Sequence, residues 1–319
     1  MNKLNIRHKT LIPLLLLIAL LHPPGIQAAP YNDFDVSNSS IPANEIHRGG
    51  PPRDGIPAID DPEFIHANKA WHVKTSQRVL GLMLNGVSKA YPISIMNWHE
   101  IVNDVFGDEK VVVTFCPLCG TGVAFSARAG GRTLNFGVSG LLYNSDVLLY
   151  DRETESLWSQ LLTRAVSGPL LGTPLTLVAL EHTTWADWRK RHPDTLVLST
   201  NTGYARDYTR DPYAGYEDSR GIYFPVAHRD PRYHPKERVL GIEVSGKYKA
   251  YPFAELSRTD GLVQDQFNGK ALNIHYDKES HSARISDAEG EALPGITSFW
   301  FAWIAFHPET EVFKATRER

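Results

Sequence analysis

The chain has 319 residues, of which 42% are hydrophobic and 22% are charged, and its formal net charge is -3. This length allows one large or two ordinary domains, and the composition is that of a globular protein that buries a core. The sequence has no basic stripe and no interleaving of aromatic and basic residues, which argues against binding of nucleic acid.

The first residues have the pattern of a secretory signal. Lys3, Arg7 and Lys9 precede an apolar run over residues 11–21, and Ala28-Ala29 offer small residues for cleavage. The run is shorter than the roughly 20 residues that a membrane span needs. We therefore expect an exported, periplasmic protein with a net charge of about -6 and no stable membrane span after cleavage. An uncleaved membrane anchor is the alternative.

One segment occurs twice in the chain. Residues 79–92 and 239–252 are identical at 8 of 14 positions with an offset of 160, including Val79-Leu80-Gly81 and Lys89-Ala90-Tyr91-Pro92. Self-similarity of this kind predicts a duplicated supersecondary unit. The period is too long for a solenoid, so the sequence predicts two related lobes.

Both copies have the pattern of β-hairpins. In each lobe a strand, a turn at Asn85-Gly86 or its equivalent and a return strand precede a short helical turn and a second hairpin. The first lobe pairs residues 101–106 with 111–116, and further hairpins are predicted over 123–138 and 147–158. We expect this last hairpin to recur at 301–313. The fold class is mainly β (α+β), with two β-rich lobes from an internal duplication joined by a segment with one or two helices.

The predicted organisation follows from these elements. The chain divides into a signal peptide (1–28), an irregular arm rich in Pro and Gly (29–70), a first lobe with both cysteines (71–165), a connecting segment (166–235) and a second lobe (236–319). The connecting segment has one helix over residues 184–191 and a long aromatic loop over 204–216. A loop of this length indicates that it covers a cleft.

Both cysteines lie in Cys116-Pro117-Leu118-Cys119-Gly120. Two thiols at this spacing can hold a metal, cycle as a disulfide or pin a turn. A thioredoxin-like site needs the first cysteine at the start of a helix. Because an alternating strand pattern, and not an amphipathic helix, follows Cys119, the sequence argues against that fold.

The other hypothesis is a metal knuckle similar to the loops of rubredoxins and zinc ribbons. If the hairpin of residues 101–116 is extended backwards, His99 lies opposite Pro117 or Leu118 and so across from the Cys pair, with directly opposed Cβ atoms about 5 Å apart. His99, Cys116 and Cys119 would then form a three-ligand set for copper or zinc. Alternatively, His99 is a satisfied core histidine, and the cysteines form a local disulfide or a buried apolar pair.

Two further observations concern which residues could belong to the predicted metal site. Asp146 could face the cysteines, although turn chemistry also explains it. At the offset of 160, Cys116 corresponds to Tyr276 and Cys119 to Glu279, so the second lobe is expected to lack the thiol site.

Several motifs together resemble a bacterial family, the domain of unknown function 3179. They are Asn97-Trp98-His99-Glu100-Ile101-Val102-Asn103-Asp104, Cys116-Pro117-Leu118-Cys119-Gly120-Thr121, Phe136-Gly137-Val138-Ser139-Gly140-Leu141-Leu142, Tyr150-Asp151-Arg152, Thr154-Glu155-Ser156-Leu157-Trp158, Asp211-Pro212-Tyr213-Ala214-Gly215-Tyr216 and Pro235-Lys236-Glu237-Arg238-Val239-Leu240-Gly241. The resemblance covers about residues 45–310. It implies an exported bacterial protein with this Cys pair, and it implies no activity.

The sequence therefore predicts an exported metal-binding protein that holds copper or zinc through His99, Cys116 and Cys119. The alternatives are a thiol-disulfide oxidoreductase outside the thioredoxin fold and a ligand-binding module with a structural Cys pair. The expected partner is a metal ion or a small molecule. Whether the protein is an enzyme stays open, and no catalytic residue is predicted.

Overall fold

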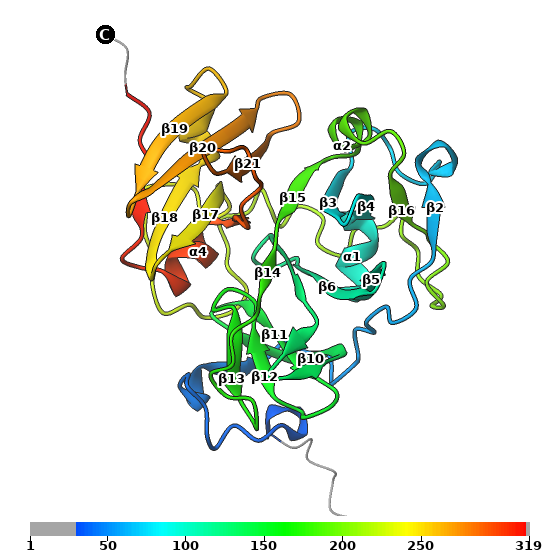
Figure 1. The fold of residues 1–319 in the computed structure, drawn as a ribbon. Coiled ribbons are helices and arrows are strands. Elements are labelled where there is room, and N and C mark those ends of the chain that lie inside the picture. Colours follow the sequence, from blue (N-terminus) through cyan, green and yellow to red (C-terminus); the bar gives the residue numbers. More distant parts are fainter. Residues whose placement is uncertain (1–29, 317–319) are drawn as a thin grey trace, which may run out of the picture.

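The computed structural model describes residues 30–316, and the expected signal peptide lies outside them. The fold is mainly β, as predicted, and has three parts (Figure 1). Two β-rich lobes lie side by side, and a third sheet below them carries the N-terminal arm. No helix among the described residues is long and apolar enough to cross a membrane.

The first lobe is built on the predicted hairpin of β3 (Arg78–Leu84) and β4 (Val87–Pro92). Asn85 and Gly86 both have positive φ, as a two-residue hairpin turn requires. Its sheet has the order β15-β3-β4-β16-β2. The remaining elements of this lobe are β2 (Phe64–His66), α1 (Ile93–His99), β15 (Leu180–Thr184), α2 (Trp185–Arg191) and β16 (Leu196–Leu198).

The second lobe repeats these pairings. β22 lies antiparallel to β17 as β15 does to β3, and β23 lies parallel to β18 as β16 does to β4. In both lobes a tryptophan of the helix before the parallel strand covers a glycine, Trp188 over Gly81 and Trp303 over Gly241. The elements are β17 (Arg238–Val244), β18 (Lys247–Pro252), α3 (Phe253–Leu256), β22 (Ile296–Phe299), α4 (Trp300–Phe306) and β23 (Glu311–Val312).

This arrangement differs from the sequence analysis at two places. Residues 301–306, predicted as a strand, form helix α4, because a short apolar run does not distinguish a buried helix from a buried strand. Residues 180–198, assigned to the connecting segment, pair with β3 and β4 and so complete the sheet of the first lobe. The helix expected at 184–191 is present, and Thr184 is its N-cap.

The second hairpins correct the alignment of the lobes. β5 (Ile101–Phe106) and β6 (Glu109–Cys116) match β19 (Leu262–Phe267) and β20 (Lys270–Asp277) with an offset of 161, because the second lobe has one extra residue after its first helix. The position of Cys116 therefore corresponds to Asp277, not Tyr276, and that of Cys119 to Ser280, not Glu279. Asp277 accepts hydrogen bonds from the N–H and hydroxyl of Ser280, so this loop is closed by polar contacts where the first lobe has thiols.

Strand β7 (Thr121–Ser126) joins the lobes. It pairs with β6 on one side and with β22 on the other, so one sheet runs β23-β18-β17-β22-β7-β6-β5 through the molecule. The hairpin predicted over 123–138 is present only next to its turn, where residues 128–129 pair with 132–133. The longer pairing is wrong, because β10 pairs with β11 and not with β7. The third sheet, order β1-β10-β11-β12-β13, contains the hairpin predicted over 147–158.

The remaining strands are short or lie in this third sheet. They are β1 (Ile46–Arg48), β8 (Arg128–Ala129), β9 (Arg132–Thr133), β10 (Phe136–Tyr143), β11 (Asp146–Asp151), β12 (Leu157–Ser159), β13 (Arg164–Ser167), β14 (Leu177–Val178) and β21 (Ser282–Ser286).

Candidate metal centre

The Cys pair lies in the connection between β6 and β7. Cys116 pairs with Thr121, so four residues close the loop, and the Cys119 carbonyl accepts hydrogen bonds from the Phe299 N–H at 2.8 Å and the Thr121 hydroxyl at 3.2 Å. Gly120 has φ 61°, and a Cβ there would lie 2.7 Å from the Phe299 ring, so only glycine fits. Both cysteines are free thiols with at most 1% of their surface exposed.

A third ligand-type group comes from the other sheet. The turn between β10 and β11 is Asn144-Ser145, and both residues have positive φ. Asp146 directly follows this turn, and the Cys119 thiol donates a hydrogen bond to its carboxyl oxygen at 2.9 Å. The ligand atoms of Cys116, Cys119 and Asp146 all lie within 4.8 Å of one another, so this buried group could hold a metal ion.

Glu100 is a second carboxyl group beside this cluster. It follows the last residue of α1 with φ 59°, a conformation that costs free energy for a residue other than glycine. Its side chain is buried, and no hydrogen bond joins its carboxyl group to another residue in the described part of the chain. Burial, together with the nearby charge of Asp146, raises its pKa to about 8.

The other acids of the cluster are also shifted towards their protonated forms. Burial raises the pKa of Asp146 to about 7 and raises the pKa of both thiols, most strongly that of Cys119. Burial thus disfavours the ionised forms of both thiols and both carboxyl groups. A divalent metal would supply a stabilising positive charge and would displace the protons.

Three polar atoms near the cluster have no hydrogen-bond partner among residues 30–316. They are the Ser145 and Tyr216 hydroxyls and the Gln160 amide oxygen, all buried. Ser145 precedes Asp146, and the amide N–H after Gln160 bonds to the Asp146 carboxyl group at 3.3 Å. Because unpaired buried polar atoms are rare in native proteins, their gathering here indicates a site built to hold a further polar species.

The His99 side chain makes its hydrogen bonds outside the thiol cluster. It is the last residue of α1, and the β5–β6 register pairs Ile101 with Thr114, so the backward extension of the hairpin through His99 does not occur. Its Nδ1 lies 2.8 Å from the Pro57 carbonyl and its Nε2 lies 2.6 Å from the Tyr208 hydroxyl. The structure brings Cys116 and Cys119 together with Asp146, and His99 is not in that group.

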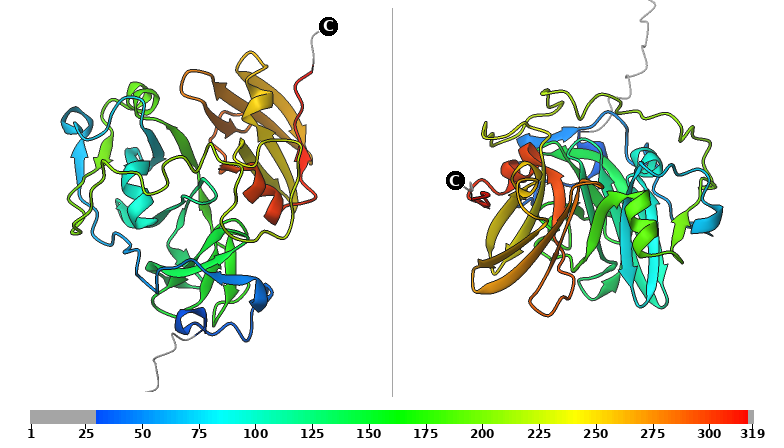
Figure 2. Two further views of the ribbon diagram at one scale, coloured as in Figure 1. Left: turned by 180° about the vertical axis from the view of Figure 1, so that it is seen from behind. Right: turned by 90° about the horizontal axis from the view of Figure 1, so that it is seen from above.

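His99 belongs instead to a set of residues that hold the aromatic loop. The Asn97 amide donates to Asp211, the Trp98 indole to the Arg210 carbonyl, and His99 contacts Tyr208. Three consecutive residues of α1 thus fix one segment of the loop, whereas Glu100, the fourth residue of the motif, is buried and its charge affects Asp146 and Cys116. Seen from behind, the loop crosses between the lobes (Figure 2).

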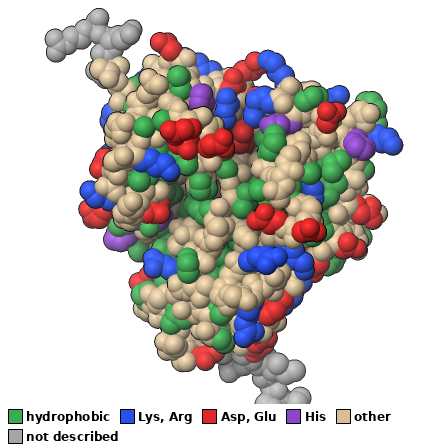
Figure 3. Space-filling model, in the orientation of Figure 1, with side chains coloured by type: hydrophobic (Ala, Val, Ile, Leu, Met, Phe, Trp, Pro, Cys, Tyr) green, Lys and Arg blue, Asp and Glu red, His purple; other side chains and the backbone are tan. Residues whose placement is uncertain are grey.

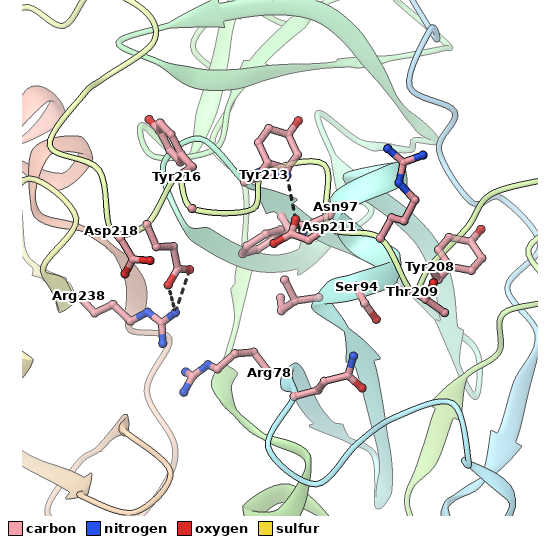
Figure 4. A pocket seen from close by; sticks show the side chains of 17 residues that line it. Arg78, Ser94, Asn97, Tyr208, Thr209, Asp211, Tyr213, Tyr216, Asp218 and Arg238 are labelled. Carbon is pink, nitrogen blue, oxygen red and sulfur yellow. Dashed lines mark hydrogen bonds and ion pairs between the residues drawn. The ribbon is translucent and has the colours of Figure 1, made fainter.

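The loop encloses a pocket of about 410 Å³ (Figure 4). Phe115 and Pro117, which flank Cys116, line this pocket together with Tyr213 and Tyr216 of the loop. The pocket therefore lies directly beside the cysteine loop, in agreement with the expectation that residues 204–216 cover a cleft. The sequence analysis names Asp146 only as a possible neighbour of the cysteines, and it does not name Glu100. The sequence pattern that could have identified Glu100 is a charged residue placed between a helix and a buried strand.

Comparison with known families agrees with the resemblance seen in the motifs. The sequence profile of the family described as "Protein of unknown function (DUF3179)" matches residues 53–310, which is more than half of the chain. The chain belongs to this family. No curated protein and no solved structure matches the chain. Membership thus confirms the predicted family and assigns no activity, so the function must be argued from the site itself.

Proposed function

We propose that this protein is an exported metal-binding protein that holds one zinc ion through Cys116, Cys119 and Asp146. The observation that carries the proposal is the convergence of three buried ligand atoms within 4.8 Å of one another. In a tetrahedral zinc site with bonds of about 2.1–2.3 Å, neighbouring ligand atoms lie roughly 3.6 Å apart. The group needs only small side-chain shifts to reach that geometry.

The donor set favours zinc over copper. Cu(I) prefers soft sulfur ligands, whereas zinc accepts thiolate and carboxylate together. Glu100 is a buried acid near these ligands but is not one of the three converging groups, and its charge raises the pKa of Cys116. A site of this kind suits metal handling, and three ligands with one exchangeable position also suit catalysis.

The redox alternative has less support. Reactive thiols have a lowered pKa because a helix N-terminus or a cation lies beside them. Here burial raises the pKa of both thiols, and the loop leads into strand β7. A dithiol in this setting is a weak nucleophile, whereas a bound metal would hold both sulfurs as thiolates.

The ligand set can be tested with two substitutions. Asp146→Asn is expected to weaken zinc binding by at least about tenfold, because an amide is a poorer ligand than a carboxylate. His99→Gln is expected to leave zinc affinity within about twofold, since both ring nitrogens contact oxygen atoms outside the cluster. Competition titration with a chromogenic chelator on reduced protein measures both. The opposite ranking would return His99 to the ligand set and remove Asp146.

Export is a separate part of the proposal and rests on the N-terminal pattern. The mature protein from its native host is expected to begin near residue 28 or 29. Intact-mass measurement of that protein decides the matter, and a chain that retains Met1 would favour a membrane anchor.

A further inference from the structure

Two arginines occupy equivalent positions in the two lobes. Arg78 begins β3 and Arg238 begins β17, and each directly precedes the shared Val-Leu-Gly. Both line the 410 Å³ pocket beside the cysteine loop, and both also line a second cavity of about 570 Å³ on the boundary between the lobes. The pair thus lies where the two cavities meet.

The two side chains extend toward each other across the pocket (Figure 4). The Arg78 guanidinium donates from its Nη atoms to three backbone carbonyls, those of His182, Ser280 and His281, at 2.5–3.0 Å. These bonds fix its position, while its Nε is buried and has no partner among the described residues. Arg78 is thereby a rigidly held cation in the lining of both cavities.

Arg238 has more N–H donors without a partner than Arg78 among the described residues. Its Nη2 contacts both carboxyl oxygens of Glu217 at 2.9 and 3.0 Å, and in the described part of the chain its Nε and Nη1 have no hydrogen-bond partner. Glu217 is 60% exposed on its side chain, whereas Arg238 is only 13% exposed. The carboxylate thus approaches from the solvent side and leaves the inner donors of Arg238 open.

The pair is electrostatically strained. Burial, together with the charge of Arg238, lowers the pKa of Arg78 to about 9. Acidic side chains also line the pocket, but Asp211 is held by Asn97 and by the Tyr213 N–H, and Glu217 is the only acid paired with either arginine among the described residues. Figure 3 shows side chains of both signs around the hollow between the lobes on the opposite face from the loop.

We propose that Arg78 and Arg238 together bind the carboxylate or phosphate group of a small molecule, whose remaining part lies against the tyrosines of the loop. An oxyanion would accept hydrogen bonds from the unused N–H donors of Arg238, and its charge would offset the mutual repulsion of the two guanidinium groups. The lining of this pocket also includes four aromatic residues, Phe115, Tyr208, Tyr213 and Tyr216. This binding site is distinct from the metal site and does not require it.

Calorimetric titration at low ionic strength with inorganic phosphate and with benzoate tests the proposal. Saturable binding of either probe is expected, and tighter binding of benzoate would identify a carboxylate ligand that uses the aromatic wall. Arg238→Gln should weaken binding by about tenfold or more, because it removes a charged donor. Arg53→Gln is the matched control: Arg53 also pairs with an exposed glutamate, Glu155, but lines neither cavity, so its effect should stay within twofold.

A second variant keeps the test decisive if Arg238→Gln folds poorly. Glu217→Gln removes the carboxylate that competes for Arg238, and because this side chain is largely exposed the fold should tolerate it. Anion affinity should then increase severalfold. The Cys116→Ser/Cys119→Ser double variant should bind the anion as the wild type does, which separates this site from the metal proposal. Absence of saturable binding in the wild type, or an affinity that neither Arg238→Gln nor Glu217→Gln changes, would overturn the assignment.

Discussion

Replacing either Cys116 or Cys119 by serine is expected to lower zinc affinity by at least about 100-fold, because a serine hydroxyl stays protonated near neutral pH and is a poor ligand for zinc. Each thiol supplies one of the three converging ligand atoms, so either change leaves only one sulfur and one carboxyl group. The two variants should lose similar amounts of affinity. Zinc titration of reduced protein against a chelator of known affinity measures the loss.

Thr121→Ser is the matched control for these variants. Thr121 is buried at the end of the same loop, and its hydroxyl bonds to the Cys119 carbonyl, a contact that serine can keep. It changes the packing of the loop without touching a ligand atom, so its zinc affinity should equal that of the wild type. Serine variants that bind zinc as tightly as this control would exclude the thiol site. Equal thermal midpoints of all variants in the presence of a chelator would show that the fold is intact.

The local parts of this site could be read from the sequence. The hairpin turns, the N-cap at Thr184 and the closely spaced thiols depend on residues that are neighbours in the chain. The family resemblance rested on such motifs as well. Asp146 was harder to assign, because it reaches the thiols only through the pairing of β10 with β11 in a different sheet. No local pattern predicts which strands of separate sheets will face each other.

The placement of His99 shows a second limit. Its proposed position depended on continuing a strand backwards from Ile101, but Glu100 takes a left-handed conformation that ends α1 and turns the chain. This conformation ends the helix directly after His99, so the His99 side chain contacts Tyr208 of the aromatic loop and does not face the thiols. The error of one residue in the alignment of the lobes has a similar origin, since a single extra residue between helix and hairpin changes every later correspondence.

The pH dependence of stability should have opposite signs without and with zinc. Asp146 and Glu100 have folded pKa values of about 7 and about 8, above their ordinary values of 3.8 and 4.5. The folded state therefore binds more protons than the unfolded state, and the stability that this provides is lost as pH rises through the folded pKa values. Between about pH 6.5 and pH 8 the metal-free protein should lose about 2 kcal/mol of unfolding free energy.

In this pH range, the change in stability comes from the two carboxyl groups and not from the buried histidines. Burial lowers the pKa of His182 and that of His307, the latter to about 4, so their contribution is lost only as pH falls below the ordinary value of 6.5. The thiols, whose pKa burial raises, act in the same direction as the two carboxyls but at higher pH. Above pH 6.5 the falling stability of the metal-free protein thus reports mainly Asp146 and Glu100.

Zinc should reverse the slope, because it binds the deprotonated ligands and competes with protons for them. Urea unfolding at several pH values between about 6.5 and 8, with a chelator and with excess zinc, measures both slopes. Asp146→Asn should flatten the decline without metal, since the amide does not titrate, and should weaken the rise with zinc. If the wild type instead keeps or gains stability with pH in the presence of the chelator, the two carboxyls are already ionised in the folded protein and their pKa values are not raised.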